Sequence, residues 1–192
     1  MKGIQFYKKA NNILGWLVFI FAAIVYISTM EKTGSFWDCG EFVPGAYKLQ
    51  VVHPPGAPFF NIIGRIFTLF AFGDVTKVAM MINLMSALST AFVVLFGFWS
   101  TSAILKKLTV KTEEDLTQER VFAILGSALV AGLSITFLDS LWFSAVEGEV
   151  YALSMFFMTF VIWATMKWDA DDSPTADRWL LLIAFMIGLS TG

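Results

Sequence analysis

Long uncharged, apolar runs alternate with short charged segments along this chain. The runs cover residues 10–30, 78–105, 121–138, 150–166 and 179–192. A helix needs roughly 20 mostly apolar residues, with a range of about 17–25, to cross a bilayer. The first four runs meet that requirement, and the fifth is incomplete where the sequence stops. The pattern predicts an all-α, polytopic membrane protein. It also predicts a single transmembrane domain over residues 1–192 and an N-terminal fragment of a longer protein.

Composition and charge agree with lipid as the solvent of this chain. The 192 residues are 57% hydrophobic and 15% charged, whereas soluble domains carry about 25% charged residues. A net charge of −2 gives no general attraction to nucleic acid. We therefore expect the lipid bilayer, and no nucleic acid, among the partners. Cys39 is the single cysteine, so an intramolecular disulfide is excluded.

The distribution of lysine and arginine predicts the orientation in the membrane. With the N-terminus in the cytoplasm, nine of these residues lie inside and four lie outside, and positive residues favour cytoplasmic loops. The first run lacks a small-x-small cleavage site, so it is expected to remain as an uncleaved anchor. Two acidic segments, residues 35–42 and 145–151, then share the extracytoplasmic side.

The first outer loop, residues 31–76, is too long for a simple connection and too apolar for a disordered one. Within it, residues 59–70 predict an apolar helix with one polar stripe, because Asn61, Arg65 and Thr68 recur at helical spacing. Such a helix either lies in the membrane interface with its stripe facing water or protein, or dips into the membrane against other helices. The sequence leaves both alternatives open.

Four acidic residues in these segments are candidates for chemistry. Asp38 and Glu41 are three residues apart, so they share a face if the chain is helical there. Such a pair can act as a base with an orienting partner, or as two ligands of a hard cation. A surface turn is the alternative, since Asp-Cys-Gly is typical of turns. Glu147, Glu149 and Tyr151 begin the fourth run, where acids also simply complement a helix dipole.

One histidine and one arginine accompany the acids. His53 precedes two prolines that fix the backbone, and it is either catalytic or simply hydrogen-bonded. Arg65, inside an apolar helix, must reach water, pair with an acid or bind an anion such as a phosphate. We expect one cluster around a cavity at the outer face, with no assigned metal ligands: Asp38, Glu41, His53, Arg65, Glu147 and Glu149.

Three ordered motifs carry a family resemblance: Trp37-Asp38-Cys39-Gly40-Glu41-Phe42, His53-Pro54-Pro55-Gly56-Ala57-Pro58 and Glu147-Gly148-Glu149-Val150-Tyr151-Ala152-Leu153. Together they resemble the N-terminal region of the protein O-mannosyltransferase-like membrane family. The resemblance implies a C-type glycosyltransferase (GT-C) helix bundle whose first extracytoplasmic loop forms the active site. It implies that Asp38 and Glu41 are catalytic. The predicted donor- and substrate-binding residues are His53, Arg65, Glu147, Glu149 and Tyr151.

The predicted function follows from that resemblance. A hexose, plausibly mannose, is expected to pass with inversion from a polyprenyl-phosphate sugar to a Ser/Thr hydroxyl of an exported protein. The predicted location is a bacterial inner membrane. No cofactor is assigned beyond the lipid-linked sugar, a divalent metal requirement stays open, and this stretch alone is expected to lack activity.

Two other functions remain as alternatives. One is a transporter or flippase of lipid-linked substrates, although no ionisable residue interrupts the middle of the four complete runs. The other is a non-catalytic membrane subunit whose acids only cap helices.

Overall fold

A computed structural model describes residues 2–54 and 56–191, so Pro55 of the second motif and Gly192 of the fifth run lie outside the described residues. Within these ranges the chain forms helices and connections and contains no β-strand. The helices long and apolar enough to cross a membrane are α1 (Lys2–Thr29), α4 (Val78–Thr109), α5 (Gln118–Thr136) and α7 (Val150–Asp169). The predicted all-α membrane helix bundle is confirmed.

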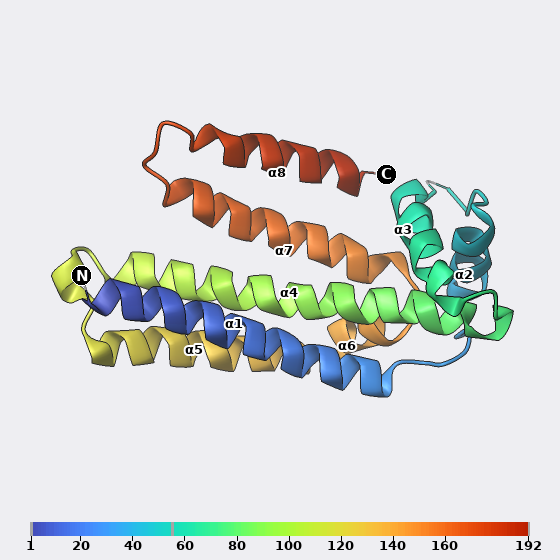
Figure 1. Ribbon diagram of the computed structural model, residues 1–192, viewed down its shortest axis with the longest axis horizontal. Helices are drawn as coiled ribbons and strands as arrows, with labels where there is room; N and C mark the ends of the chain where they lie inside the picture. The colour runs from blue at the N-terminus through green and yellow to red at the C-terminus, as the bar shows by residue number, and fades with distance from the viewer. Residues whose placement is uncertain (1, 55, 192) are drawn as a thin grey trace.

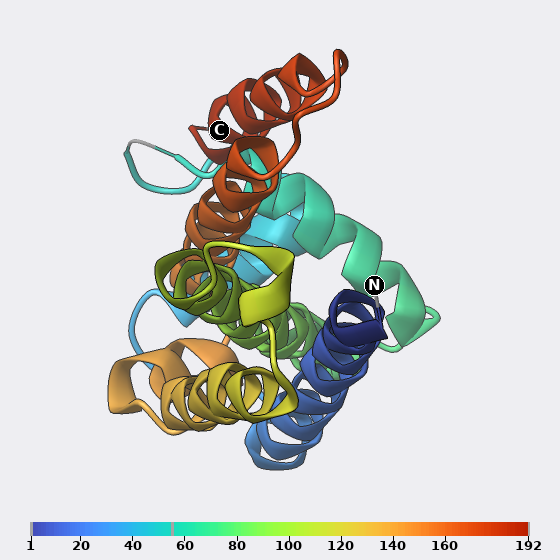
Figure 2. The ribbon, with the colours of Figure 1, turned by 90° about the vertical axis from the view of Figure 1, so that its left-hand side faces the viewer.

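Helix α4 occupies the centre of the bundle (Figures 1 and 2). Helices α1, α5 and α7 pack against it, and α8 (Asp177–Ser190) packs against α7 on the side away from α4. The most apolar part of α4 is 67% buried, compared with 28% in α1 and 17% in α7. α4 is therefore the core helix, whereas α1 and α7 turn most of their apolar surface outward.

Small and hydroxyl-bearing side chains let the other helices approach α4 closely. Ala87 and Ala91 are completely buried, as expected where helices pack in a membrane. Ser89 Oγ donates to Met85 O at 2.8 Å, and Thr90 Oγ1 donates to Ser86 O at 2.9 Å. These hydroxyls are satisfied by the backbone of their own helix, so they can be buried without partners on other helices.

Short helices gather at one end of the bundle (Figure 1). The loop after α1 forms α2 (Cys39–Lys48), α3 (Pro58–Thr68) and the 3₁₀ turns η1 (Leu69–Ala71) and η2 (Val75–Lys77). The connection between α5 and α7 forms α6 (Asp139–Val146). The turn η3 (Glu113–Asp115) connects α4 to α5 at the opposite end of the bundle (Figure 1). The sequence pattern did not predict α6 as a separate helix.

Helix α3 turns its polar stripe towards protein. Asn61 Nδ2 donates to Gln50 O at 2.9 Å, and Arg65 Nη1 donates to Tyr47 O at 3.0 Å. Asn61 is buried, whereas Ile62 and Ile66 on the opposite side are exposed. Of the two alternatives for this helix, the structure therefore has the stripe buried against a neighbouring helix, with the apolar side facing outward.

Candidate functional site

The turn between α6 and α7 carries two glutamates and is pressed against α4. Glu147 follows α6, and Glu149 directly precedes α7. A Cβ atom on Gly148 would lie 2.9 Å from Ile82 Cγ2 and 3.0 Å from Asn83 Oδ1, both on α4. The missing side chain at Gly148 therefore lets the turn approach α4 this closely, which fixes the position of both glutamates.

Asn83 ties the segment that follows α1 to the same place. Its Nδ2 donates to Glu31 O at 2.8 Å and to Thr33 O at 3.2 Å. The backbone N–H of Glu31 in turn donates to Val146 O at 2.9 Å, at the end of α6. The buried Asn83 amide thus anchors the segment that leads into Asp38, and one backbone hydrogen bond joins this segment to the end of α6, more than a hundred residues later in the sequence.

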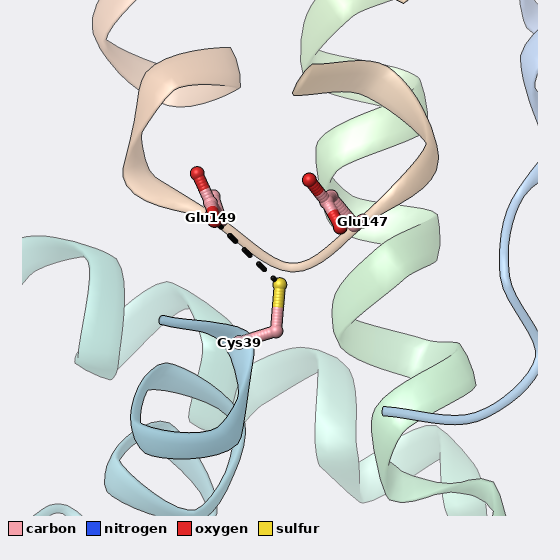
Figure 3. Close-up of side chains that lie close together, drawn as sticks. All are labelled: Cys39, Glu147 and Glu149. Atoms are coloured by element: carbon pink, nitrogen blue, oxygen red, sulfur yellow. Dashed lines mark hydrogen bonds between the residues drawn. The ribbon is translucent and has the colours of Figure 1, made fainter. Parts of the chain in front are cut away.

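Cys39, Glu147 and Glu149 meet in what we call the carboxylate cluster (Figure 3). Their exposed fractions are 1%, 4% and 5%. Cys39 Sγ donates to Glu149 Oε1 at 3.9 Å, and one ligand atom from each residue lies within 4.8 Å of the others. Two carboxyl groups are therefore held together at the end of the bundle, removed from bulk water.

Burial governs the protonation of this cluster. Burial first, and then the charges of Glu147 and Glu149, raise the pKa of the Cys39 thiol to about 12, so the sulfur stays protonated at neutral pH. Burial, followed by the charges of Glu147 and Asp38, also raises the pKa of Glu149. Within the described part of the chain, no Lys or Arg nitrogen lies within 4.0 Å of either glutamate. Glu149 thus retains its proton to a higher pH than an ordinary glutamate.

Asp38 stands at the edge of the cluster. It is the N-cap residue of α2 and is half-buried, and its side chain makes no capping hydrogen bond. Its charge acts on both Glu149 and His53. The preceding Trp37 has φ 69°, in the left-handed region that bulky residues rarely adopt, and exposes its ring. The Asp38 side chain is therefore partly accessible at the edge of the carboxylate cluster.

Glu41 and His53 form an exposed pair beside Asp38. His53 Nδ1 and Glu41 Oε2 are 2.8 Å apart, and the His53 ring centroid lies 5.5 Å from that of Phe42. The hydrogen bonds from His53 lower the pKa of Glu41, and the same contact raises the pKa of His53. His53 is thus hydrogen-bonded, which is compatible with either role, and the contact makes Glu41 a weaker base than an unpaired glutamate.

The remaining predicted residues lie in other surroundings. Arg65 Nη1 also contacts Thr68 Oγ1 at 3.3 Å, and the guanidinium lies 5.1 Å from the centre of the Tyr47 ring. Tyr151, in the first turn of α7, is exposed.

A cavity of about 300 Å³ lies between α2 and the start of α4, and its lining includes Cys39 and Tyr47 but none of the predicted acids. The structure thus gathers Asp38, Glu147 and Glu149, and places Arg65 in the contact between α2 and α3.

Cys39 is the member of the cluster that the sequence did not indicate. A lone cysteine in Asp-Cys-Gly carries no spacing pattern, and its glutamate neighbour is 110 residues away. Thiolate and carboxylate groups are ligand types that Zn²⁺ accepts, whereas Mg²⁺ and Ca²⁺ prefer oxygen alone. A metal ion would have to displace the proton of the Cys39 thiol, whose pKa burial raises to about 12. A divalent metal requirement therefore stays open.

These features define an integral membrane protein of the helix-bundle class, with buried carboxyl groups at one end of its bundle. Residues 38–192 match the family described as "Protein O-mannosyl-transferase TMEM260 N-terminal domain", and the chain belongs to that family. The family resemblance that the three sequence motifs indicated is thereby confirmed.

Two curated relatives show how much of the chain is shared. The chain is 26% identical over 155 residues to "Protein O-mannosyl-transferase tmem260" of Dictyostelium discoideum, covering 81% of this chain and 17% of that protein. It is 27% identical over 175 residues to "Protein O-mannosyl-transferase TMEM260" of Mus musculus, covering 90% of this chain and 22% of that protein. The chain thus spans about a fifth of the length of these relatives. No solved structure is significantly similar to it.

Proposed function

We propose that this chain forms the catalytic N-terminal part of a membrane glycosyltransferase. The enzyme would move a hexose, mannose in the simplest case, from a polyprenyl-phosphate sugar to a Ser/Thr hydroxyl of an exported protein. The observation that carries the proposal is the Asp38 carboxylate, which makes no capping hydrogen bond and lies beside buried acids at one end of the bundle. The names of both relatives support O-mannosyl transfer as the reaction.

Asp38 acts as the general base in this proposal. It accepts the proton of the acceptor hydroxyl while that oxygen forms a bond to the anomeric carbon of the sugar. The bond between this carbon and the donor phosphate oxygen breaks, and the phosphate leaves with the electron pair. A phosphate is a good leaving group, so no strong general acid is needed. Attack opposite the leaving group inverts the anomeric centre, by analogy with inverting glycosidases.

Neighbouring groups position the two substrates. Burial raises the pKa of Glu149, which favours its protonated form, and in that form Glu149 would donate a hydrogen bond to a sugar hydroxyl. Arg65 uses Nη1 for both of its hydrogen bonds to protein, which leaves its other guanidinium N–H groups for the donor phosphate. His53, Glu147 and Tyr151 would complete the binding surface. The active end would face the extracytoplasmic side of the membrane, because the lysines and arginines favour a cytoplasmic N-terminus.

The test is transfer of labelled mannose from a polyprenyl-phosphate donor to an acceptor protein by the protein at its natural length, reconstituted in lipid. Asp38→Asn keeps the shape of the side chain but removes the proton acceptor. We expect turnover to fall by at least about 100-fold, with donor binding little changed. The matched control is Asp139→Asn, the same substitution at an exposed residue that begins α6, which is expected to retain transfer.

Near-normal transfer by Asp38→Asn would refute Asp38 as the base. Equal losses in Asp38→Asn and Asp139→Asn would indicate a general effect of charge at this end, and would contradict the proposed role as well. Gel filtration and thermal unfolding of both variants separate a loss of chemistry from a loss of fold.

A further inference from the structure

A second, larger cavity lies at the opposite end of the bundle from the carboxylate cluster. It occupies about 1060 Å³ between the first turns of α1, the last turns of α4 and α7, and the start of α8. Figure 1 places these four helix termini together, on the left, and Figure 2 views the molecule from that side. The proposed transfer reaction uses none of its lining residues.

Four lysines from three helices line this space, which we call the lysine cavity. They are Lys8 of α1, Lys106 and Lys107 of α4, and Lys167 of α7. Lys8 and Lys106 lie close enough to Lys167 for their charges to act on it. Like charges repel one another, so positive charge concentrated from three separate helices has an energetic cost that a bound anion would offset.

Two aspartates border the cavity, and both are engaged with other groups. Asp169 forms an ion pair with Lys107 at 2.5 Å. Asp171 accepts hydrogen bonds from Ser173 N at 3.0 Å and from Trp179 Nε1 at 3.2 Å. Among the side chains that the structure describes, no carboxylate lies within 4.0 Å of Lys8, Lys106 or Lys167. Three ammonium groups therefore face the cavity without an acidic partner.

The rest of the lining combines aromatic rings with neutral polar groups. Trp163 lies 5.7 Å from Trp99 and 5.8 Å from Trp179, measured between ring centroids. Lys167 Nζ lies 5.6 Å from the Trp163 ring. Asn11, whose Oδ1 accepts a 2.6 Å hydrogen bond from Ser102 Oγ, adds an amide. Rings with polar edges beside ammonium groups are typical of the headgroup region of a membrane.

The cavity also lies at the correct depth for a headgroup. Helix α1 has 28 residues, which makes it about 42 Å long, and the hydrocarbon core of a bilayer is about 30 Å thick. Lys8 and Lys9 give α1 a charged N-terminal end, so its first turns are the part that extends past the hydrocarbon, into the layer that holds lipid phosphates. Long lysine side chains reach that layer readily from helix ends.

We propose that the lysine cavity binds the phosphate of an anionic lipid headgroup. Phosphate oxygens accept hydrogen bonds from several ammonium groups at once, and each such bond is strengthened by charge. The occupant is thus a phospholipid with a net negative charge, on the side of the membrane opposite to the carboxylate cluster.

The experiment measures which lipids the protein retains. The protein at its natural length is reconstituted in phosphatidylcholine nanodiscs with a minority of phosphatidylglycerol, washed in detergent, and examined by native mass spectrometry. The test variant combines Lys106→Gln with Lys167→Gln. The control variant combines Lys9→Gln with Lys111→Gln, which removes the same charge from lysines at this end that do not line the cavity.

We expect the wild type and the control variant to retain phosphatidylglycerol in preference to phosphatidylcholine, and the test variant to lose this retention by roughly tenfold or more. Equal losses in both variants, or no preference in the wild type, would refute the cavity as the binding site. Displacement of the lipid by inorganic phosphate at modest concentration would overturn the lipid assignment in favour of a free anion. Matching thermal unfolding of the two variants confirms that both are folded.

Discussion

At the end of the bundle formed by α2, α3 and α6, acidic side chains are buried beside a thiol, and the backbone around them is fixed by close packing and by the Asn83 amide. At the other end, lysines extend from the termini of long helices around an open cavity. Carboxylates have short stems, so the backbone itself must bring them together. Lysines have long apolar stems, so they can converge on one space from the ends of three different helices.

This difference between the two ends determines which changes in packing, pH or charge each end tolerates. A buried carboxyl group without a cation responds by holding its proton, which makes its protonation depend on precise packing. An exposed ammonium group keeps its charge and adjusts its position. We therefore expect the acidic end to be sensitive to changes in backbone packing and pH, and the lysine end to be sensitive mainly to the number of charges.

The largest expected effect comes from adding a methyl group at two closely packed glycines, Gly148 at the acidic end and Gly15 in the middle of α1. Gly148→Ala places a Cβ 2.9 Å from Ile82, and Gly15→Ala places one 2.3 Å from Trp99 Nε1. Each should cost about 1–3 kcal/mol of stability by overpacking, measured by thermal unfolding. Only Gly148→Ala should also reduce mannose transfer per folded molecule. Gly126→Ala, which meets no atom within 4 Å, is the control. If Gly148→Ala behaves like that control, the turn is not tightly packed.

A smaller effect distinguishes Asp38 from Glu41, the two acids at the start of α2. Because its hydrogen bonds with His53 lower the pKa of Glu41, this residue is a poor base and should act by holding the loop. Glu41→Gln is expected to reduce turnover less than about tenfold, well below the loss in Asp38→Asn. Steady-state transfer kinetics of the two variants give the comparison. A larger loss of turnover in Glu41→Gln than in Asp38→Asn would show that Glu41, and not Asp38, is the general base.

The pH dependence of stability tests the burial of Glu149. Its pKa is raised in the folded protein, so the folded state binds the proton more readily than the unfolded state. This carboxyl group therefore reduces stability as the pH rises through its folded pKa. Glu149→Gln should raise the melting temperature at pH 8. It should leave the melting temperature at pH 4 nearly unchanged. An equal change in melting temperature at both pH values would contradict a raised pKa for Glu149.

The smallest effect is expected at the lysine end. The Lys107–Asp169 pair joins α4 to α7 at 2.5 Å, but both side chains are largely solvated, with 63% and 37% of their surfaces exposed. A double-mutant cycle with Lys107→Gln and Asp169→Asn should give a coupling of about 0.2–1 kcal/mol, reduced further by salt. A coupling well above that range would show that this end is more rigid than we propose.

The sequence predicted the helix bundle because a long apolar segment in lipid must satisfy its own backbone hydrogen bonds, which a helix does. Counting the runs also predicted that Asp38 and Glu147 share one end, since each crossing reverses the side of the chain. The burial of Glu147 and Glu149 was not predictable, because it depends on how Gly148 packs against α4. The contact of Arg65 with Tyr47 depends likewise on the direction in which α3 turns its stripe. Both follow from long-range packing that has no local signature.

The hydroxyl groups of α4 have a consequence for how the protein is made. α4 is synthesised before α5, α6 and α7, so it enters the bilayer before most of its neighbours exist. Ser89, Thr90 and Thr101 donate to carbonyl groups one turn earlier in the same helix, so lipid can surround them at little cost. The helix that ends up most buried can therefore enter the membrane before the later helices are translated and assemble around it.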